Sequence, residues 1–269
     1  MTESGSELTA AAVDDYIFRR SIHMQLMVQG MLKAAGDIHD KRCLAIGSPN
    51  AMMSRQLRLA GGSWKELVFS EDIAQRVSQI TGDTKVEIFD GSEQLPFDDK
   101  SFDVVIILAG LSDRKSDYDF IEMCHKLIDS DGHLIVCVPR EKKLSLINSL
   151  RSICGVAETL YSERKLFDIM KNGFDVMQMR SSSRFFIESV DAVTRCMAQK
   201  KTDAAARMRV YKIAHPFYAV AYQIDALIFF TRGHRLIASA KRHSWRSRTA
   251  PILSDGRSIS EAVLKPLTG

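Results

Sequence analysis

The chain has 269 residues, of which 45% are hydrophobic and 26% are charged. These values are typical of folded soluble proteins and argue against a disordered, fibrous or integral-membrane chain. The length suits one α/β domain with added helices.

The cysteines and the N-terminus favour a cytoplasmic protein. The five cysteines are odd in number and lack metal-site spacing, which argues against a disulfide framework or a zinc site. The N-terminal segment MTESGSELTAAAVDD is acidic and polar and lacks the order of a signal peptide. We therefore expect a cytoplasmic location and no bound metal.

Charge is unevenly distributed along the chain. The net charge is +4, but residues 195–248 hold twelve Lys or Arg and only two acids, which gives this region +10. The rest of the chain therefore carries −6. A basic region on an acidic body indicates contact with something anionic.

The elements alternate in type after a leading helix. Residues 13–35 carry apolar side chains at helical spacing, and Gly36 suits the helix end, so one helix is predicted there. From residue 42, short apolar runs alternate with polar stretches, which is typical of a parallel sheet with crossover helices. The predicted strands are 43–47, 66–70, 85–89, 102–108 and 133–139, and the predicted helices are 50–60, 72–80 and 116–129.

Three elements are expected after the fifth strand. Ser162 is placed to cap a helix that runs to Lys171. The stretches FDVMQM and RFFIESV, separated by SSS, are predicted to form two strands of a hairpin.

Polar residues follow the strands where a doubly wound sheet binds its ligand. Gly47 opens the loop 47–54, which leads into a helix with exposed backbone N–H groups. Glu71 and Asp72 follow the second strand, where an acid can accept hydrogen bonds from a ribose, although acids also suit a helix start. Asp90 follows the third strand, a position that is also typical of a turn residue.

The middle of the chain resembles a known family. The stretch IFDGSEQLPFDDKSFDVVIILAGL, then a helix, then LIDSDGHLIVCVPR, is similar to the centre of class I S-adenosylmethionine-dependent methyltransferases of type 11. SERKLFDIMKNGFDV is similar to the helix and strand entry that follow in that family. The resemblance implies an α/β fold with a Rossmann-like, doubly wound, mostly parallel seven-stranded sheet, a C-terminal antiparallel hairpin and added terminal helices. Its expected regions are an N-terminal helical cap at 1–40, the methyltransferase-like domain at 41–191 and a helical, basic extension at 192–269.

The resemblance also implies where S-adenosylmethionine would bind. Asp90 would bind the adenine amino group, Glu71 or Asp72 the ribose, and residues from Leu108 would form the floor near the methyl donor. The implied cofactor-binding residues are Gly47, Ser48, Asn50, Glu71, Asp72, Asp90, Gly91, Ser92, Leu108 and Ala109.

The first loop departs from the family pattern of a strand acid followed by GxGxG. Ala45 stands in place of the acid, which removes a hydrogen-bond acceptor, and the turn reads GSPNA, so only Gly47 is kept. Added Cβ atoms restrict how closely backbone approaches a cofactor. Two functions stay open: methyl transfer to a small-molecule or lipid-like acceptor, or a non-catalytic scaffold that has lost the cofactor.

No catalytic residue is indicated. His125 and His133 are expected to be structural, because they lie away from the predicted binding edge. His23, on the leading helix, could line a substrate entrance, although a packed or exposed histidine is also common there.

The C-terminal region contains one long apolar segment. IAHPFYAVAYQIDALIFF, at 213–230, is too polar to span a membrane, because it contains a central Asp225 as well as His215, Pro216 and Gln223. It is either a helix packed on the sheet or a partner subunit, with Asp225 paired to an arginine, or a helix lying on a membrane. In the second case Phe217, Tyr218, Tyr222, Phe229 and Phe230 would enter the interface, while Arg232, Arg235, Lys241, Arg242, Arg246 and Arg248 meet anionic headgroups.

Residues 207–248 are thus expected to meet a protein partner or an anionic membrane surface, which would make the protein peripheral at the membrane. Nucleic acid is not an expected partner, because no nucleic-acid-binding motif accompanies the basic residues.

Overall fold

The computed structural model describes residues 9–83, 85–92, 94–109, 111, 117–141, 159–228 and 233–245. Five of the residues expected at a membrane surface lie outside these ranges, namely Phe229, Phe230, Arg232, Arg246 and Arg248.

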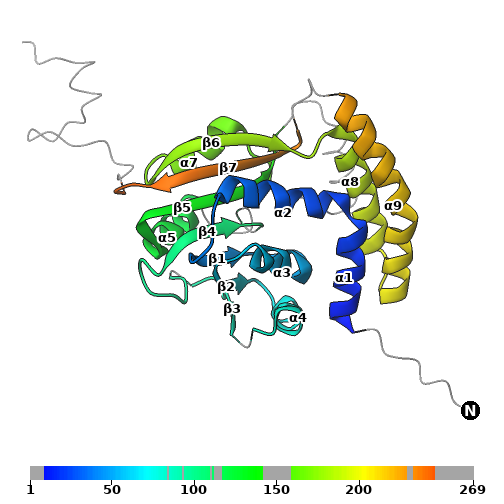
Figure 1. Cartoon of the computed structure of the whole chain (residues 1–269), viewed down its shortest axis with the longest axis horizontal. Coiled ribbons are helices and arrows are strands. Elements are labelled where there is room, and N and C mark those ends of the chain that lie inside the picture. Colours follow the sequence, from blue (N-terminus) through cyan, green and yellow to red (C-terminus); the bar gives the residue numbers. More distant parts are fainter. Residues whose placement is uncertain are drawn as a thin grey trace, which may run out of the picture.

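A seven-stranded sheet in the order β3-β2-β1-β4-β5-β7-β6 forms the centre of the molecule (Figure 1). The strands β1 (Arg42–Ile46), β2 (Ser63–Val68), β3 (Val86–Ile88), β4 (Phe102–Ile107) and β5 (Ile128–Pro139) run parallel. β7 (Arg235–Arg242) is antiparallel between β5 and β6 (Phe174–Ser182). The fold is therefore the Rossmann-like, doubly wound class with an antiparallel hairpin, as predicted, and the strand order reverses between β1 and β4.

Helices cover both faces of this sheet. In β1, Leu44 and Ile46 pack with α5 (Asp117–Leu127) and α7 (Glu163–Met170), whereas Cys43 and Ala45 pack with α2 (Ile22–Ala35) and α3 (Ala51–Leu59). Successive side chains of a strand point to opposite faces, so a strand covered on both sides must be apolar throughout. α4 (Glu71–Thr81) packs beside α3.

The predicted elements between residues 42 and 139 are confirmed, with shifts of up to five residues at their ends; the largest is at the start of β5, which begins at Ile128 and not at residue 133. The Ser162 cap is also confirmed, because its hydroxyl accepts a hydrogen bond from the Lys165 N–H at 3.0 Å. The leading helix is in fact two helices, α1 (Ala10–Arg20) and α2. Ser21 separates them: its N–H ends α1 by donating to carbonyls of that helix, and its hydroxyl caps α2.

The strand predicted for RFFIESV is wrong. These residues begin the helix α8 (Phe185–Gln199), which is followed by α9 (Ala204–Leu227). The buried carboxylate of Asp225 on α9 accepts hydrogen bonds from the N–H groups of Phe186 and Ile187, at 3.1 and 2.9 Å, and so caps α8. The strand that pairs with β6 is β7, which lies inside the region expected to be a helical extension.

The helices α1, α8 and α9 stand together across the carboxyl ends of the parallel strands (Figure 1). We call these three helices the cap. Val13 and Ile17 of α1 pack with Val210 and Tyr211 of α9. The segment expected to pack on the sheet or on a partner thus packs on helices of its own chain, and among the described arginines Arg184 donates a hydrogen bond to the backbone carbonyl of Asp225.

Two further features bear on the sequence expectations. Within the described ranges, no helix has both the length and the apolar character that a membrane span needs. Cys43, Cys124 and Cys137 are free and buried, whereas Cys196 on α8 takes part in a disulfide that the cysteine spacing did not predict.

Candidate functional site

A pocket of about 310 Å³ lies between the cap and the point where the strand order reverses. Ligand pockets in proteins typically begin near this size, and doubly wound sheets bind ligands at this place. The pocket is lined by Asp14, Ile17, His23, Met24, Met27, Pro49, Asn50, Met53, Arg76, Leu108, Ala109, Asp191, Arg195, Ala198, Gln199, Arg207, Tyr211 and Arg235.

The loop after β1 needs its one glycine. Gly47 has φ of +72°, and a Cβ added there would lie 2.3 Å from the Ala109 carbonyl oxygen and 2.7 Å from the Phe69 ring. No other residue fits this conformation and this contact. The loop therefore lies directly against the end of β4.

A buried carboxylate organises the same loop from the neighbouring strand. Glu66 of β2 pairs in register with Ala45 of β1. Its carboxylate accepts hydrogen bonds from the hydroxyls of Ser48 and Ser54, at 2.5 and 2.7 Å, and from Arg58 at 2.9 Å. The acceptor that Ala45 lacks is thus present one strand away.

The buried position of Glu66 affects its ionisation. Burial raises the pKa of this carboxyl, and the Arg58 guanidinium and the two serine hydroxyls oppose the shift. The three donors hold the loop in one shape, because leaving any of them unpaired in the interior would cost free energy.

The N-terminus of α3 is already occupied by a side chain of the cap. The Asp14 carboxylate accepts the Ala51 N–H at 3.1 Å and the Arg76 guanidinium at 2.9 Å. Asn50 caps α3 through the Met52 N–H at 2.9 Å, and its amide donates to the Asp14 carbonyl. Burial raises the pKa of Asp14, and Arg76 opposes the shift. The cap thus places an anion where such a loop would otherwise offer a free N–H.

The predicted residues after β2 and β3 are exposed and lie outside this pocket. Glu71 and Asp72 open α4, and Asp72 pairs with Arg76 at 2.7 Å. The exposed Asp90 accepts the N–H of Ser92 at 2.9 Å across Gly91, whose φ is +92°. This turn is held by its own residues.

Three predicted residues do line the pocket. Asn50 comes from the loop after β1, and Leu108 and Ala109 come from the end of β4. Leu108 is buried, whereas Ala109 is exposed. The structure therefore divides the predicted set into one group at the pocket, another at the β2 and β3 turns, and the pair Gly47 and Ser48, which lie in the β1 loop but do not line the pocket.

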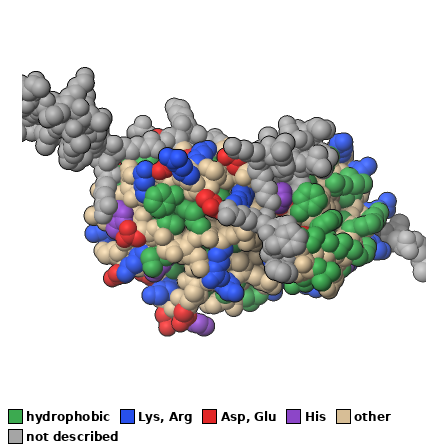
Figure 2. Space-filling model, turned by 90° about the horizontal axis from the view of Figure 1, so that it is seen from above, with side chains coloured by type: hydrophobic (Ala, Val, Ile, Leu, Met, Phe, Trp, Pro, Cys, Tyr) green, Lys and Arg blue, Asp and Glu red, His purple; other side chains and the backbone are tan. Residues whose placement is uncertain are grey.

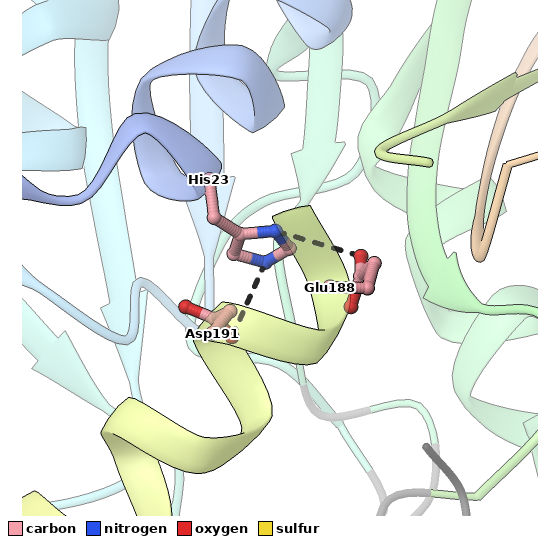
Figure 3. A group of neighbouring side chains, drawn as sticks. All are labelled: His23, Glu188 and Asp191. Atoms are coloured by element: carbon pink, nitrogen blue, oxygen red, sulfur yellow. Dashed lines mark ion pairs between the residues drawn. The ribbon is translucent and has the colours of Figure 1, made fainter. Parts of the chain in front are cut away.

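Beside the pocket lies a buried group of ionisable side chains (Figure 3). His23 on α2 lies 3.5 Å from Glu188 and 3.8 Å from Asp191, both on α8. Burial lowers the pKa of His23, although the two carboxylates oppose the shift. His23 therefore lines the pocket, as one of the sequence alternatives had it, mainly as a neutral imidazole.

The charges of this group are balanced within the protein. The Arg195 guanidinium lies 2.8 Å from Asp191, and the Arg235 guanidinium lies 3.6 Å from Glu188. Tyr218 donates a further hydrogen bond to Asp191 at 2.9 Å. Although three ligand atoms of His23, Glu188 and Asp191 lie within 4.8 Å of one another, the two guanidinium charges disfavour a metal cation there.

The structure places arginines at the pocket that the sequence did not predict there. Arg195, Arg207 and Arg235 belong to the basic region that we expected to meet a surface, yet all three line the pocket. The two aspartates that line the pocket, Asp14 and Asp191, were not predicted as site residues either. A signal that could have been used is the spacing of Asp191 and Arg195, which lie one helical turn apart and form an ion pair.

The middle of the chain matches a known protein family. Residues 44–136, from β1 into β5, match the family described as methyltransferase domain. The match includes all the loops at which the cofactor residues were predicted. It covers 93 of the 269 residues, so it concerns the middle of the chain alone.

Solved structures share the fold over most of this chain. A methyltransferase from Thermotoga maritima is 13% identical, with 86% of this chain and 94% of that chain covered and a TM-score of 0.54. One from Mesorhizobium loti is 14% identical, with 80% and 96% covered and a TM-score of 0.51. Both are described as dependent on S-adenosylmethionine. These likenesses show that the chain has the fold of these methyltransferases.

The same fold also occurs in a protein named for another reaction. The [4+2]-cyclase SpnF is 14% identical, with 87% of this chain and 80% of that chain covered and a TM-score of 0.51. No curated protein is significantly similar in sequence. Fold alone does not fix the reaction, so function must be argued from the site.

Proposed function

We propose that this protein transfers a methyl group from S-adenosylmethionine to a small acceptor that binds beneath the cap. The observation that carries the proposal is the pocket of about 310 Å³, which joins the ends of β1 and β4 to the cap helices. Three methionines and Ile17 make part of its wall apolar, which suits an acceptor with a hydrophobic part.

The residues at the β2 and β3 turns fit the nucleoside part of the cofactor. The carboxylates of Glu71, Asp72 and Asp90 are exposed at neighbouring strand ends, where ribose hydroxyls and an adenine amino group need acceptors. When bound, the cofactor supplies an activated methyl group. The protein then has to hold the acceptor in line and exclude water, which the cap over the pocket favours.

The residues at the β1 loop fit less well. The Ala51 N–H is taken by Asp14, so a cofactor carboxylate would meet an anion at the N-terminus of α3. This observation favours a second candidate function, namely a non-catalytic methyltransferase-like protein that has lost the cofactor and serves as a scaffold.

The outer surface of the cap suits such a scaffold. Figure 2 shows hydrophobic side chains gathered over the α8–α9 end of the molecule. The exposed hydrophobic side chains of these two helices include Met197 on α8, 51% exposed, and Ile213, Phe217 and Leu227 on α9, which are 67%, 61% and 77% exposed. Lys212, next to Ile213 in the sequence, is also exposed. A cationic apolar surface of this kind fits an anionic membrane. Tyr218, which we had expected on this surface, is buried.

Calorimetric titration of the protein with S-adenosylmethionine and S-adenosylhomocysteine separates the two candidates. Methyl transfer predicts binding of both, weakened about tenfold by Asp90→Ala because an anionic hydrogen-bond acceptor is removed. Asp98→Ala, at an exposed carboxylate beyond the site, is the matched control and should bind normally.

Folded protein that binds neither compound would overturn methyl transfer. The scaffold candidate then predicts sedimentation with vesicles that contain phosphatidylserine, weakened by Phe217→Gln. Equal sedimentation of wild-type protein with neutral and anionic vesicles would contradict an anionic membrane as the partner.

A further inference from the structure

Four arginines line the pocket, and three of them are paired with carboxylates. Arg76 lies 2.9 Å from Asp14, and its other amino group lies 2.7 Å from Asp72. Arg195 and Arg235 lie 2.8 and 3.6 Å from the two buried acids of α8. These three arginines therefore have their charge balanced inside the protein.

Arg207 is the exception. It comes from the first turn of α9 and is only partly exposed. Its Nε is buried and has no hydrogen-bond partner in the described part of the chain, and no ion pair joins its guanidinium to a described carboxylate. The charge of Arg207 acts on Asp14, but the oxygens of Asp14 already face Arg76 and the α3 N–H.

A buried donor such as this Nε is costly to leave without a partner, so protein interiors normally pair such groups. The guanidinium is a planar fork of donors that matches the two oxygens of a carboxylate or a phosphate. Tyr211, one turn further along α9, also lines the pocket beside Arg207. The pocket thus combines a cation that lacks a partner with space for one.

We propose that the pocket beneath the cap binds a small ligand through an anionic carboxylate or phosphate group, and that Arg207 is the residue that pairs with this group. The proposal holds whether or not the protein transfers methyl groups. Two sources share this chemistry: an anionic group of the acceptor, and the carboxylate of the cofactor's amino-acid part.

Inorganic phosphate is the probe for this site. Its binding to the whole chain is measured as the rise in unfolding temperature in phosphate relative to chloride at equal ionic strength, so that general screening cancels. We expect wild-type protein to show the rise. Arg207→Gln should lower the phosphate affinity about tenfold, because a charge-assisted pair is lost.

Arg209→Gln is the matched control. It removes the same charge from the same helix at an exposed position, and it should bind phosphate like the wild type. Arg207→Lys keeps the charge but not the fork, so an intermediate affinity is expected. Each variant's unfolding temperature in chloride alone shows whether it is folded.

A second titration identifies the source of the anion. Competition between phosphate and S-adenosylhomocysteine would assign Arg207 to the cofactor carboxylate, and simultaneous binding would assign it to the acceptor. Both results support the anion site. No phosphate-dependent rise in wild-type protein, or an equal rise in wild type and Arg207→Gln, would overturn the proposal.

Discussion

The loop after β1 and the turn after β3 lie at the same edge of the sheet, yet they are held in opposite ways. The β1 loop is buried and fixed by side chains from β2, α3 and the cap, above all Glu66 and Asp14. The β3 turn is exposed, and Asp90 bonds to the backbone only two residues away. In the β1 loop, hydrogen bonds from distant side chains fix the backbone where the family pattern has flexible glycines. In the β3 turn, the local sequence determines the shape.

The largest effect should come from breaking the network of the β1 loop. Glu66→Ala leaves Arg58 and two serine hydroxyls without their buried acceptor, and we expect a loss of about 3–5 kcal/mol in the free energy of unfolding. Asp90→Ala should change stability by no more than about 0.5 kcal/mol, because this turn is exposed. Denaturant unfolding of both variants tests the contrast, and equal losses would contradict it.

The next effect concerns the glycine that the β1 loop has kept. Gly47→Ala forces a Cβ onto the Ala109 carbonyl at a positive φ, and we expect a cost of about 3 kcal/mol. Gly82→Ala is the control: its φ is +74°, but nothing lies within 4 Å of the added Cβ. It should cost about 1 kcal/mol, the strain alone. Similar unfolding free energies for the two variants would show that the contact with β4 does not matter.

Removing the Asp14 carboxylate, which lies against the β1 loop, should lower the free energy of unfolding by a smaller amount. It also tests whether this anion hinders cofactor binding. Asp14→Ala frees the Ala51 N–H and Arg76, with an expected loss of about 2 kcal/mol. Because an anion no longer competes there, affinity for S-adenosylhomocysteine should rise about tenfold. Calorimetry compares this variant with Asp15→Ala, which removes the adjacent carboxylate of α1. A fall in affinity would mean that Asp14 helps to bind the cofactor.

The smallest effect lies at the opposite edge of the sheet. Arg42 hydrogen-bonds to Asp103 and Asp129, and these contacts hold the pKa of Asp103 below its ordinary value of 3.8. Since the folded pKa is the lower one, the stabilisation is present above the ordinary value and is lost as the pH falls below it. Unfolding temperatures between about pH 5 and pH 2 should therefore fall less steeply in Arg42→Met than in wild type. Parallel curves would contradict this.

The sheet from β1 to β5 could be predicted because its signals are local. Each strand is a short apolar run bounded by polar residues. Ser162, the N-cap residue of α7, marks the start of that helix by its own hydroxyl. The hairpin could not be placed, because RFFIESV has the side chains of a strand. Its helix depends on Asp225, which is distant in the sequence and caps the N-terminus of α8.

The site was predictable only in the residues that follow strands. Asn50, Leu108 and Ala109 reach the pocket because strand order alone places them at the crevice. Arg207 and Arg235 could not be found in this way, since basic residues are normally solvated and nothing local marks one as buried. The replacement of the missing β1 acid by Glu66 was equally hidden, because it depends on the register between two strands.

The segment that contains α8 and α9 leaves the sheet after β6 and returns to it at β7, and these two strand ends lie side by side. Ser182, the last residue of β6, is paired with Arg235, the first residue of β7, and the His234 N–H donates to the Ser183 carbonyl at 2.7 Å. The residues between these two strand ends are an insertion in a hairpin whose strands are already paired at that end. A change in the length or sequence of this insertion leaves the strand order intact. The pocket over the ends of β1 and β4 can therefore be remodelled in evolution while the sheet beneath it stays the same.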